Sequence, residues 1–303
     1  MSSNTFKKTI IKVIIYILRF YTQHSPIIRG KHRLTRYIRF LLNELSNPVI
    51  TISKFGHKFL LKFPDDNNRV IIYTTGYFEK EHSKFIKEYL RNTDITFDVG
   101  ANIGWFTVMM ADYGKICHAF EPNEDVFNRL NENVSLNGLS SKTKLNTIAL
   151  GKEKGTDKFY TFKFLHHGYS SLSKRGRNDY IEHNIKIDTL SNYLDKNNIT
   201  KVDFIKVDIE GGEFDFLIGC GEYLAKFNDC LFMMELNESS LSQFNRKPDD
   251  VLELFRKNNF HPFYLDKKNK LKKLIAIEKN EIRENLFFAT ESLIKTRLNN
   301  FIE

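Results

Sequence analysis

The sequence has few cysteines and no pattern that would pair them. Cys117, Cys220 and Cys230 are the three cysteines among 303 residues, and their spacing fits neither a disulfide framework nor a zinc site. This excludes the small disulfide-stapled scaffolds. It predicts a chain that works in a reducing compartment, which favours a cytoplasmic location.

Apolar runs long enough to cross a membrane are also lacking. Residues 9–18 ("TIIKVIIYIL") are apolar apart from Thr9 and Lys12, but a span needs about 20 apolar residues. A charged start and a short apolar run also occur in signal peptides, yet no small-residue cleavage site follows. We expect a helix that packs on the core or on a partner subunit, or a basic amphipathic helix on a membrane surface.

Acidic residues are nearly absent from the first fifty positions. Glu44 is the single acid there, against nine lysines and arginines, so this segment carries +8 of the net charge of +9. The excess charge is therefore local, and residues 1–45 are predicted to form a basic helical extension. Such an extension suits peripheral association with an anionic membrane or contact with a phosphate-bearing acceptor.

Repeats and low-complexity linkers are absent, and from residue 95 strands alternate with helices. Near-continuous apolar strands are predicted over the ranges 95–99, 115–122, 144–151, 203–211 and 230–237. Such strands, with helices between them, indicate an α/β fold with a doubly wound, mostly parallel sheet covered on both faces. We expect the core to occupy residues 96–303, after a strand and helix lead-in over 46–95.

A strand that ends in an acid meets a turn with two glycines over residues 96–105, "TFDVGANIGW". Gly100 and Gly104 would let the backbone turn tightly and approach a ligand, or would serve strand–helix packing alone. In a doubly wound sheet ligands bind at such strand ends. Asp98 would repel a dinucleotide pyrophosphate, but its carboxylate suits a ligand with an ammonium and a sulfonium, such as S-adenosylmethionine.

A second acid, Glu121, ends the next strand, 17 residues after Gly104. A carboxylate there can accept hydrogen bonds from both ribose hydroxyls of a nucleoside. On its own it could be a surface acid before the turn at Pro122. Together with Asp98 and the glycine turn, it predicts an S-adenosylmethionine site.

Three segments resemble the FkbM-type methyltransferases of the class I S-adenosylmethionine-dependent fold. They are "TFDVGANIGWFT" (96–107), "AFEPNEDVFNRLNENVSLNGL" (119–139) and "VDFIKVDIEGGEFDFLIG" (202–219), within a resemblance that covers roughly residues 70–292. The resemblance implies a Rossmann-like seven-stranded sheet with the last strand antiparallel. It also implies methyl transfer to a hydroxyl oxygen, often on a sugar or a polyketide.

The resemblance also implies roles for individual positions. The residues that would face the methionine part of the cofactor are Asp98, Gly100, Asn102 and Gly104. Glu121 would hold the ribose, and the backbone around Ala149 and Leu150 would edge the adenine. A polar insertion before the fourth core strand would face the acceptor, through Tyr169, Ser170 and Ser171.

Proton removal from a sugar hydroxyl calls for a general base. Asp208 and Glu210 end the fourth core strand, and alternation puts both on one side of it. We favour Asp208 slightly over Glu210, with His167 of the insertion as an alternative base. Asp208 could instead hydrogen-bond the turn amides near Gly211.

A divalent metal is possible but not favoured. Asp208, Glu235 and Asn237 end two neighbouring strands, and with Glu210 they would offer the oxygen ligands that Mg²⁺ prefers. No compact ligand motif enforces such a site.

The sequence thus predicts an S-adenosylmethionine-dependent O-methyltransferase that acts on a sugar hydroxyl of a glycan or glycolipid. The rivals are an RNA methyltransferase that grips its substrate through the basic extension, and an O-methyltransferase of a polyketide or other small molecule. Nucleic acid is disfavoured because "DIEG" (208–211) replaces the Asn/Asp-Pro-Pro-aromatic motif of enzymes that methylate base nitrogens.

Overall fold

The computed structural model describes residues 3–24, 34, 37–38, 40–41, 48–62, 67–162, 180–274 and 285–303. The chain divides into two compact units, one over residues 1–80 and the other over 81–164 and 169–303. The division falls inside the lead-in predicted over 46–95, so the predicted strand pair and the predicted helix belong to different units.

Among its described residues, the first unit contains helices α1 and α3 and a two-stranded antiparallel sheet. These elements are α1 (Ser3–His24), β1 (Val49–Ile52), β2 (Lys58–Leu61) and α3 (Asn67–Thr75). α1 packs on α3, and Thr22 Oγ1 donates to the Thr74 carbonyl over 2.8 Å. The predicted basic extension over 1–45 is not confirmed as a whole, because α1 is its only continuous described part. Among the described residues, no helix has the length and apolar character that a membrane crossing requires.

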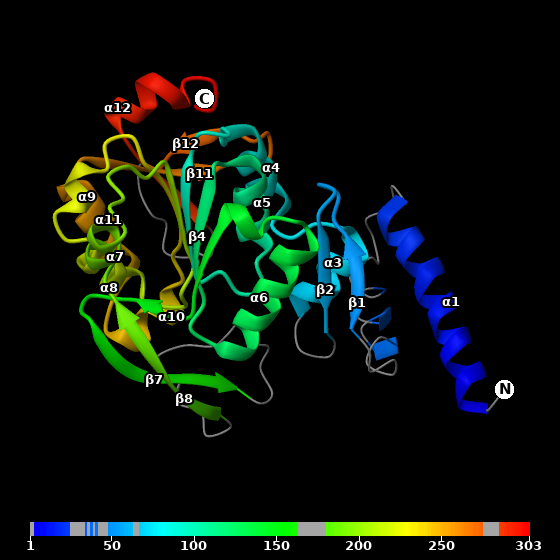
Figure 1. Cartoon of the computed structure of the whole chain (residues 1–303). Helices are drawn as coiled ribbons and strands as arrows, with labels where there is room; N and C mark the ends of the chain where they lie inside the picture. The colour runs from blue at the N-terminus through cyan, green and yellow to red at the C-terminus, as the bar shows by residue number, and fades with distance from the viewer. Residues whose placement is uncertain are drawn as a thin grey trace. The chain divides into compact units, whose positions relative to one another are not determined.

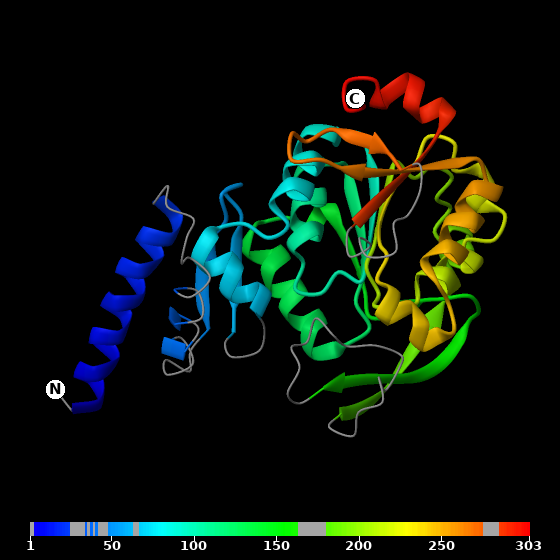
Figure 2. The same ribbon diagram turned by 180° about the vertical axis from the view of Figure 1, so that it is seen from behind.

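The second unit is built on a sheet with the strand order β12-β11-β13-β10-β9-β3-β4-β5 (Figures 1 and 2). Its strands are β3 (Ile95–Val99), β4 (Ile116–Phe120), β5 (Thr143–Asn146), β9 (Phe204–Val207), β10 (Leu231–Glu235), β11 (Phe260–Leu265), β12 (Leu271–Lys273) and β13 (Asn285–Thr290). β5, β4, β3, β9 and β10 are mutually parallel, and β13 is antiparallel to both its neighbours. The predicted α/β fold with a mostly parallel sheet and an antiparallel last strand is confirmed. The short edge strand β12 makes an eighth strand where seven were expected.

Helices cover both faces of this sheet, with α4, α5 and α6 on one side and α7, α8, α9 and α11 on the other (Figures 1 and 2). The helices and helical turns are α4 (Lys80–Tyr89), α5 (Trp105–Tyr113), α6 (Glu124–Leu136), η1 (Ser140–Lys142), α7 (Leu190–Lys196), α8 (Glu213–Gly219), α9 (Tyr223–Lys226), α10 (Glu238–Leu241), η3 (Ser242–Phe244), α11 (Pro248–Lys257), α12 (Glu291–Leu293) and η4 (Ile294–Leu298). Both faces are apolar. Phe232 packs with Phe255 on the α11 side, whereas Phe287 packs with Phe85 on the α4 side.

A smaller three-stranded sheet contains β6 (Ala149–Leu150), β8 (Tyr180–Asp188) and β7 (Gly155–Phe162). Figures 1 and 2 both show it at the end of the large sheet where α10 lies, opposite the end with α12. The strand predicted over 144–151 is therefore two strands in two sheets. The helix predicted after the fourth core strand is likewise split, because Gly221 takes a left-handed φ of 56° between α8 and α9.

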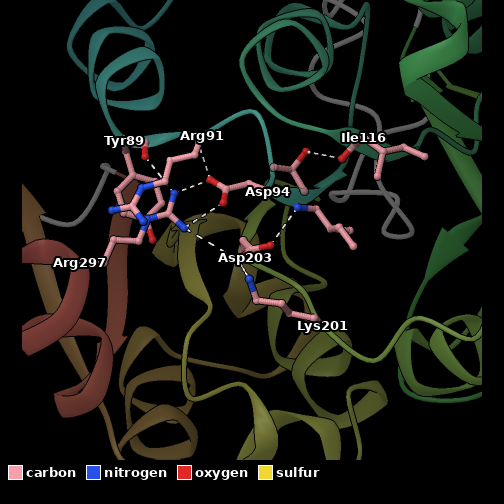
Figure 3. A network of polar contacts seen from close by, with 9 residues as sticks. Tyr89, Arg91, Asp94, Ile116, Lys201, Asp203 and Arg297 are labelled. Carbon is pink, nitrogen blue, oxygen red and sulfur yellow. Dashed lines mark hydrogen bonds and ion pairs between the residues drawn. The ribbon is translucent and has the colours of Figure 1, made fainter.

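A buried polar network fastens the last part of the chain to the amino ends of β3 and β9 (Figure 3). The Arg297 guanidinium forms a two-pronged pair with Asp94 and donates to the Tyr89 carbonyl over 2.9 Å. Asp203, which lies 3.9 Å from Arg297, accepts the Ile95 N–H over 2.9 Å. These contacts hold the sheet at the end opposite to the glycine turn.

Candidate active site

The turn after β3 is a tight structure in which both glycines have a steric reason. Gly100 and Gly104 have φ of 79° and 88°, the left-handed region where a side chain is strained. A Cβ on Gly100 would lie 1.8 Å from the Asp208 carbonyl oxygen, and one on Gly104 would lie 2.5 Å from Leu130 Cδ1. Gly100 and Gly104 are therefore required by the packing of the turn, independently of any ligand that the turn binds.

Asp98 lies beside Lys206 in the middle of the sheet. The two are register partners on parallel strands β3 and β9, so their side chains point to the same face. The Lys206 ammonium is 3.6 Å from Asp98 Oδ1, and Thr107 Oγ1 donates to Asp98 Oδ2 over 2.6 Å. Burial raises the pKa of Asp98, while Lys206 and Thr107 act in the opposite direction. Lys206 is only 3% exposed and lies at the centre of the site, and the sequence pattern did not predict this.

Glu121 faces the same turn from the end of β4. Its Oε2 accepts the Asn102 N–H and its Oε1 accepts the Asn123 N–H, each over 3.0 Å. Burial raises the pKa of Glu121 to about 7, against the lowering effect of these two backbone donors. Each carboxylate oxygen has a second lone pair, so the group can still accept two further hydrogen bonds.

Asn102 adopts a φ of 49°, and its Oδ1 accepts the N–H of Ile103 over 2.8 Å. Its backbone thus joins the turn to Glu121, and its side chain stabilises the turn itself.

Asp208 follows β9 and joins the two halves of the site. Lys206 Nζ donates to Asp208 Oδ2 over 3.2 Å and to the Gly100 carbonyl over 3.2 Å. Burial acts to raise the pKa of Asp208. The Lys206 ammonium and hydrogen bonds from Glu235 and Lys206 outweigh that effect, so the pKa lies below its usual value.

Three acids gather at the ends of β9 and β10. Asp208, Glu210 and Glu235 each offer an oxygen within 4.8 Å of the others, and all three side chains are partly exposed. Glu210 has a φ of 57°, and its Oε2 accepts the Ser240 hydroxyl over 3.1 Å. Asn237 has a different role, because its Oδ1 accepts the N–H groups of Ser239 and Ser240 and caps α10.

The turn amides that Asp208 could have bound are taken by Glu213. Its Oε1 accepts from the Ile209 N–H at 3.3 Å and the Gly211 N–H at 3.2 Å. Burial raises the pKa of Glu213 to about 7, because the side chain is shielded from water. Among the described residues, Lys206 and Glu235 are the side-chain partners of Asp208.

Ala149 and Leu150 form β6, which pairs with Ile187 and Asp188 of β8. The predicted adenine edge thus belongs to the small sheet. The four predicted residues of the polar insertion lie outside the described residues: His167, Tyr169, Ser170 and Ser171.

Sequence reasoning missed Lys206, Thr107 and Ser240. A lysine inside the apolar strand "FIKV" was the one available signal, because burying an unpaired ammonium is costly and implies an acidic neighbour. Thr107 and Ser240 carry no such signal, since they reach the acids only through the fold.

The residues around the turn suit a cationic nucleoside. Within the described part of the chain, Asp98 Oδ1 is a buried atom with no hydrogen-bond partner. Glu121 keeps acceptor capacity for a pair of hydroxyl donors. Carboxyl groups with acceptor capacity thus flank both sides of the glycine turn.

The FkbM methyltransferase domain profile matches residues 98–262, which is more than half of the chain. The chain belongs to the FkbM methyltransferase family. Hexuronic acid methyltransferase AglP of Haloferax volcanii is 24% identical to this FkbM methyltransferase over 209 residues, which cover 67% of this chain and 80% of AglP. Family and relative make the chain an S-adenosylmethionine-dependent methyltransferase.

Solved structures overlap more loosely with this FkbM methyltransferase. An rRNA methylase from Streptococcus thermophilus is 14% identical, with a TM-score of 0.38, over 68% of this chain and 91% of the other. TYW2 of M. jannaschii in complex with AdoMet is 15% identical, with a TM-score of 0.39, over 80% of this chain and 84% of the other.

Proposed function

We propose that this FkbM methyltransferase transfers a methyl group from S-adenosylmethionine to a hydroxyl oxygen of a sugar, on a glycan or glycolipid. The observation that carries the proposal is the acid cluster of Asp208, Glu210 and Glu235, held next to Asp98 by Lys206. The similarity to AglP, which is named for a hexuronic acid, supports a carbohydrate acceptor.

On the cofactor side, Asp98 and the turn from Gly100 to Gly104 would hold the methionine part, and Glu121 the ribose. Ala149 and Leu150 would border the adenine. When bound, S-adenosylmethionine supplies a methyl carbon that its sulfonium already activates. The chain must then orient the acceptor oxygen and remove one proton.

On the acceptor side, Asp208 is the proposed base. Its carboxylate stays ionised beside Lys206 and is partly open to solvent, so it can accept a hydroxyl proton. Asp208 would take the proton of the acceptor hydroxyl as its oxygen receives the methyl group, and the cofactor would leave as its demethylated, uncharged sulfide. Glu210 and Glu235 would accept hydrogen bonds from other acceptor hydroxyls.

The charge of the cluster also favours this acceptor class. The carboxyl groups of the cluster can accept hydrogen bonds from the hydroxyls of a sugar, and the ionised Asp208 repels the phosphates of an RNA backbone, since like charges at this range are unfavourable. A neutral sugar face satisfies the cluster, whereas an RNA backbone does not. The insertion with His167, Tyr169, Ser170 and Ser171 would add acceptor contacts, and His167 is the alternative base.

The test is mass spectrometry of the surface glycans of the host, with and without the gene. Loss of one methyl group would identify the acceptor and the hydroxyl position, and unchanged glycans would contradict a glycan acceptor. With the acceptor known, Asp208→Asn should lower kcat by about 10²–10⁴-fold while S-adenosylmethionine affinity changes little. Asp249→Asn, at an exposed acid on α11, is the matched control.

A divalent metal at the acid cluster is the alternative way to activate the hydroxyl. Full activity in EDTA would remove it, and loss of activity restored by Mg²⁺ would establish it. Because Asn237 Oδ1 caps α10, the ligands would come from Asp208, Glu210 and Glu235.

The other acceptors have their own tests. Salt-sensitive retention on RNA that disappears on deletion of residues 1–45 would favour an RNA methyltransferase. Methylation of a free polyketide or other small molecule would assign the third class.

A cytoplasmic location is part of the proposal, because all three cysteines are buried and free.

A further inference from the structure

The N-terminal helix α1 exposes a continuous apolar stripe. Its large apolar side chains are between 44% and 70% exposed, at spacings of three and four residues: Phe6, Ile10, Val13, Tyr16, Ile17 and Phe20. Such spacing places them along one helix face. Contiguous exposed apolar surface of this kind marks an interaction site.

The stripe is not the face that α1 uses inside its own unit. Ile11 and Ile15 are 7% and 2% exposed, and Thr22, on the same face, hydrogen-bonds to the Thr74 carbonyl. At 3.6 residues per turn, this packed face lies roughly opposite to the stripe. The helix therefore presents two apolar faces, one of which is covered within the unit.

The charges of α1 are of one sign. Lys7, Lys8, Lys12 and Arg19 lie on the helix, and its 22 residues include no acid. Lys8 and Lys12 are exposed and lie on the flank of the helix between the stripe and the packed face. Apposition of two copies of this face would bring lysines together with no carboxylate to pair them, whereas anionic headgroups complement them.

We infer that α1 is a membrane-surface helix, which lies along an anionic bilayer with its stripe of Phe6, Ile10, Val13, Tyr16, Ile17 and Phe20 in the headgroup–acyl boundary. Aromatic and branched apolar residues beside lysines are the composition of helices that bind at this depth. The inference does not depend on the acceptor or on catalysis.

The experiment is co-sedimentation of the full chain with vesicles of phosphatidylcholine, alone or mixed with phosphatidylserine. Binding to the mixed vesicles, weakened by salt, is expected. A variant with Ile10→Ser, Val13→Ser and Ile17→Ser should lose at least roughly tenfold in partitioning. Lys8→Ala with Lys12→Ala should lose roughly 25-fold on the mixed vesicles, at about fivefold per lysine, and little on phosphatidylcholine alone.

The control is Ile218→Ser, which removes a similarly exposed isoleucine from α8 in the second unit and should leave binding unchanged. Wild-type chain that stays in the supernatant with both vesicles would overturn the inference. So would a dimer in sedimentation velocity that the apolar variant dissociates, without vesicle binding, because the face would then belong to a second copy. Unchanged thermal unfolding of each variant shows that lost binding is not lost folding.

Discussion

Replacement of Lys206 by methionine tests the central arrangement of the site. The substitution keeps an unbranched side chain and removes the ammonium that lies 3.6 Å from Asp98 Oδ1 and 3.2 Å from Asp208 Oδ2. At an effective dielectric constant of about 20, each pair corresponds to about 5 kcal/mol of attraction. Most of this is offset by the cost of burying the charges.

What remains after the substitution is a carboxyl group, Asp98, with no access to water and no cation. Removing one partner of a buried pair costs about 3–5 kcal/mol, so we expect Lys206→Met to lower the free energy of unfolding by that amount. Lys226→Met is the matched control. Its exposed pair with Glu222 predicts a change within about 0.5 kcal/mol.

The assay is urea unfolding followed by the fluorescence of Trp105, the single tryptophan, which is buried in α5 of the same unit. Asp98→Asn in the Lys206→Met background should recover part of the loss, with a coupling energy of about 1–3 kcal/mol. If Lys206→Met costs less than about 1 kcal/mol, or the two changes simply add, then the pair does not organise the site.

Two further predictions concern the turn and the ribose acid. Gly100→Ala should destabilise the protein by about 3 kcal/mol or more, since the new Cβ would lie 1.8 Å from the Asp208 carbonyl oxygen. The control is Gly155→Ala, which has open space around the new Cβ and should change the midpoint of unfolding little. Equal effects of the two substitutions would refute the steric argument. The affinity for S-adenosylhomocysteine should fall about tenfold from about pH 8 to about pH 6, because ribose hydroxyls bind the ionised form of Glu121. The pKa of Glu121 is about 7, so below that pH the binding of the ligand releases a proton. Calorimetry in two buffers measures that proton, and Glu121→Gln should abolish both effects; a pH-independent affinity of the wild-type chain would contradict the assignment.

The strands that sequence predicted best are those whose burial is uniform. Residues 95–99 form a strand with the expected bounds, and four of its five residues are buried. The apolar pattern over residues 144–151 could not show that this segment forms two strands. The break at Thr147 and Ile148 arises because β5 joins the large sheet and β6 joins the small one. β7 and β8 pair in register although both carry charged residues, and such pairing depends on a distant partner.

The candidate site divides in the same way. Asp98, Glu121 and Asp208 could be located because Asp98 lies near the carboxyl end of an apolar strand and the other two directly follow one, and the carboxyl ends of parallel strands lie at one edge. The role of Lys206 could not be predicted, because strand alternation shows on which face of the sheet a side chain lies but not how deeply it is buried. That role depends on the Asp98 carboxylate, 108 positions earlier in the chain.

The place of β13 between β10 and β11 has a consequence for synthesis on the ribosome. β10 and β11 are synthesised before β13. One edge of each strand therefore stays unpaired until residues 285–290 have been synthesised. These are the edges that β13 will cover, and unpaired strand edges tend to join another polypeptide. Chaperone protection should matter most in that interval, and ribosome stalling just before β13 should yield aggregated product.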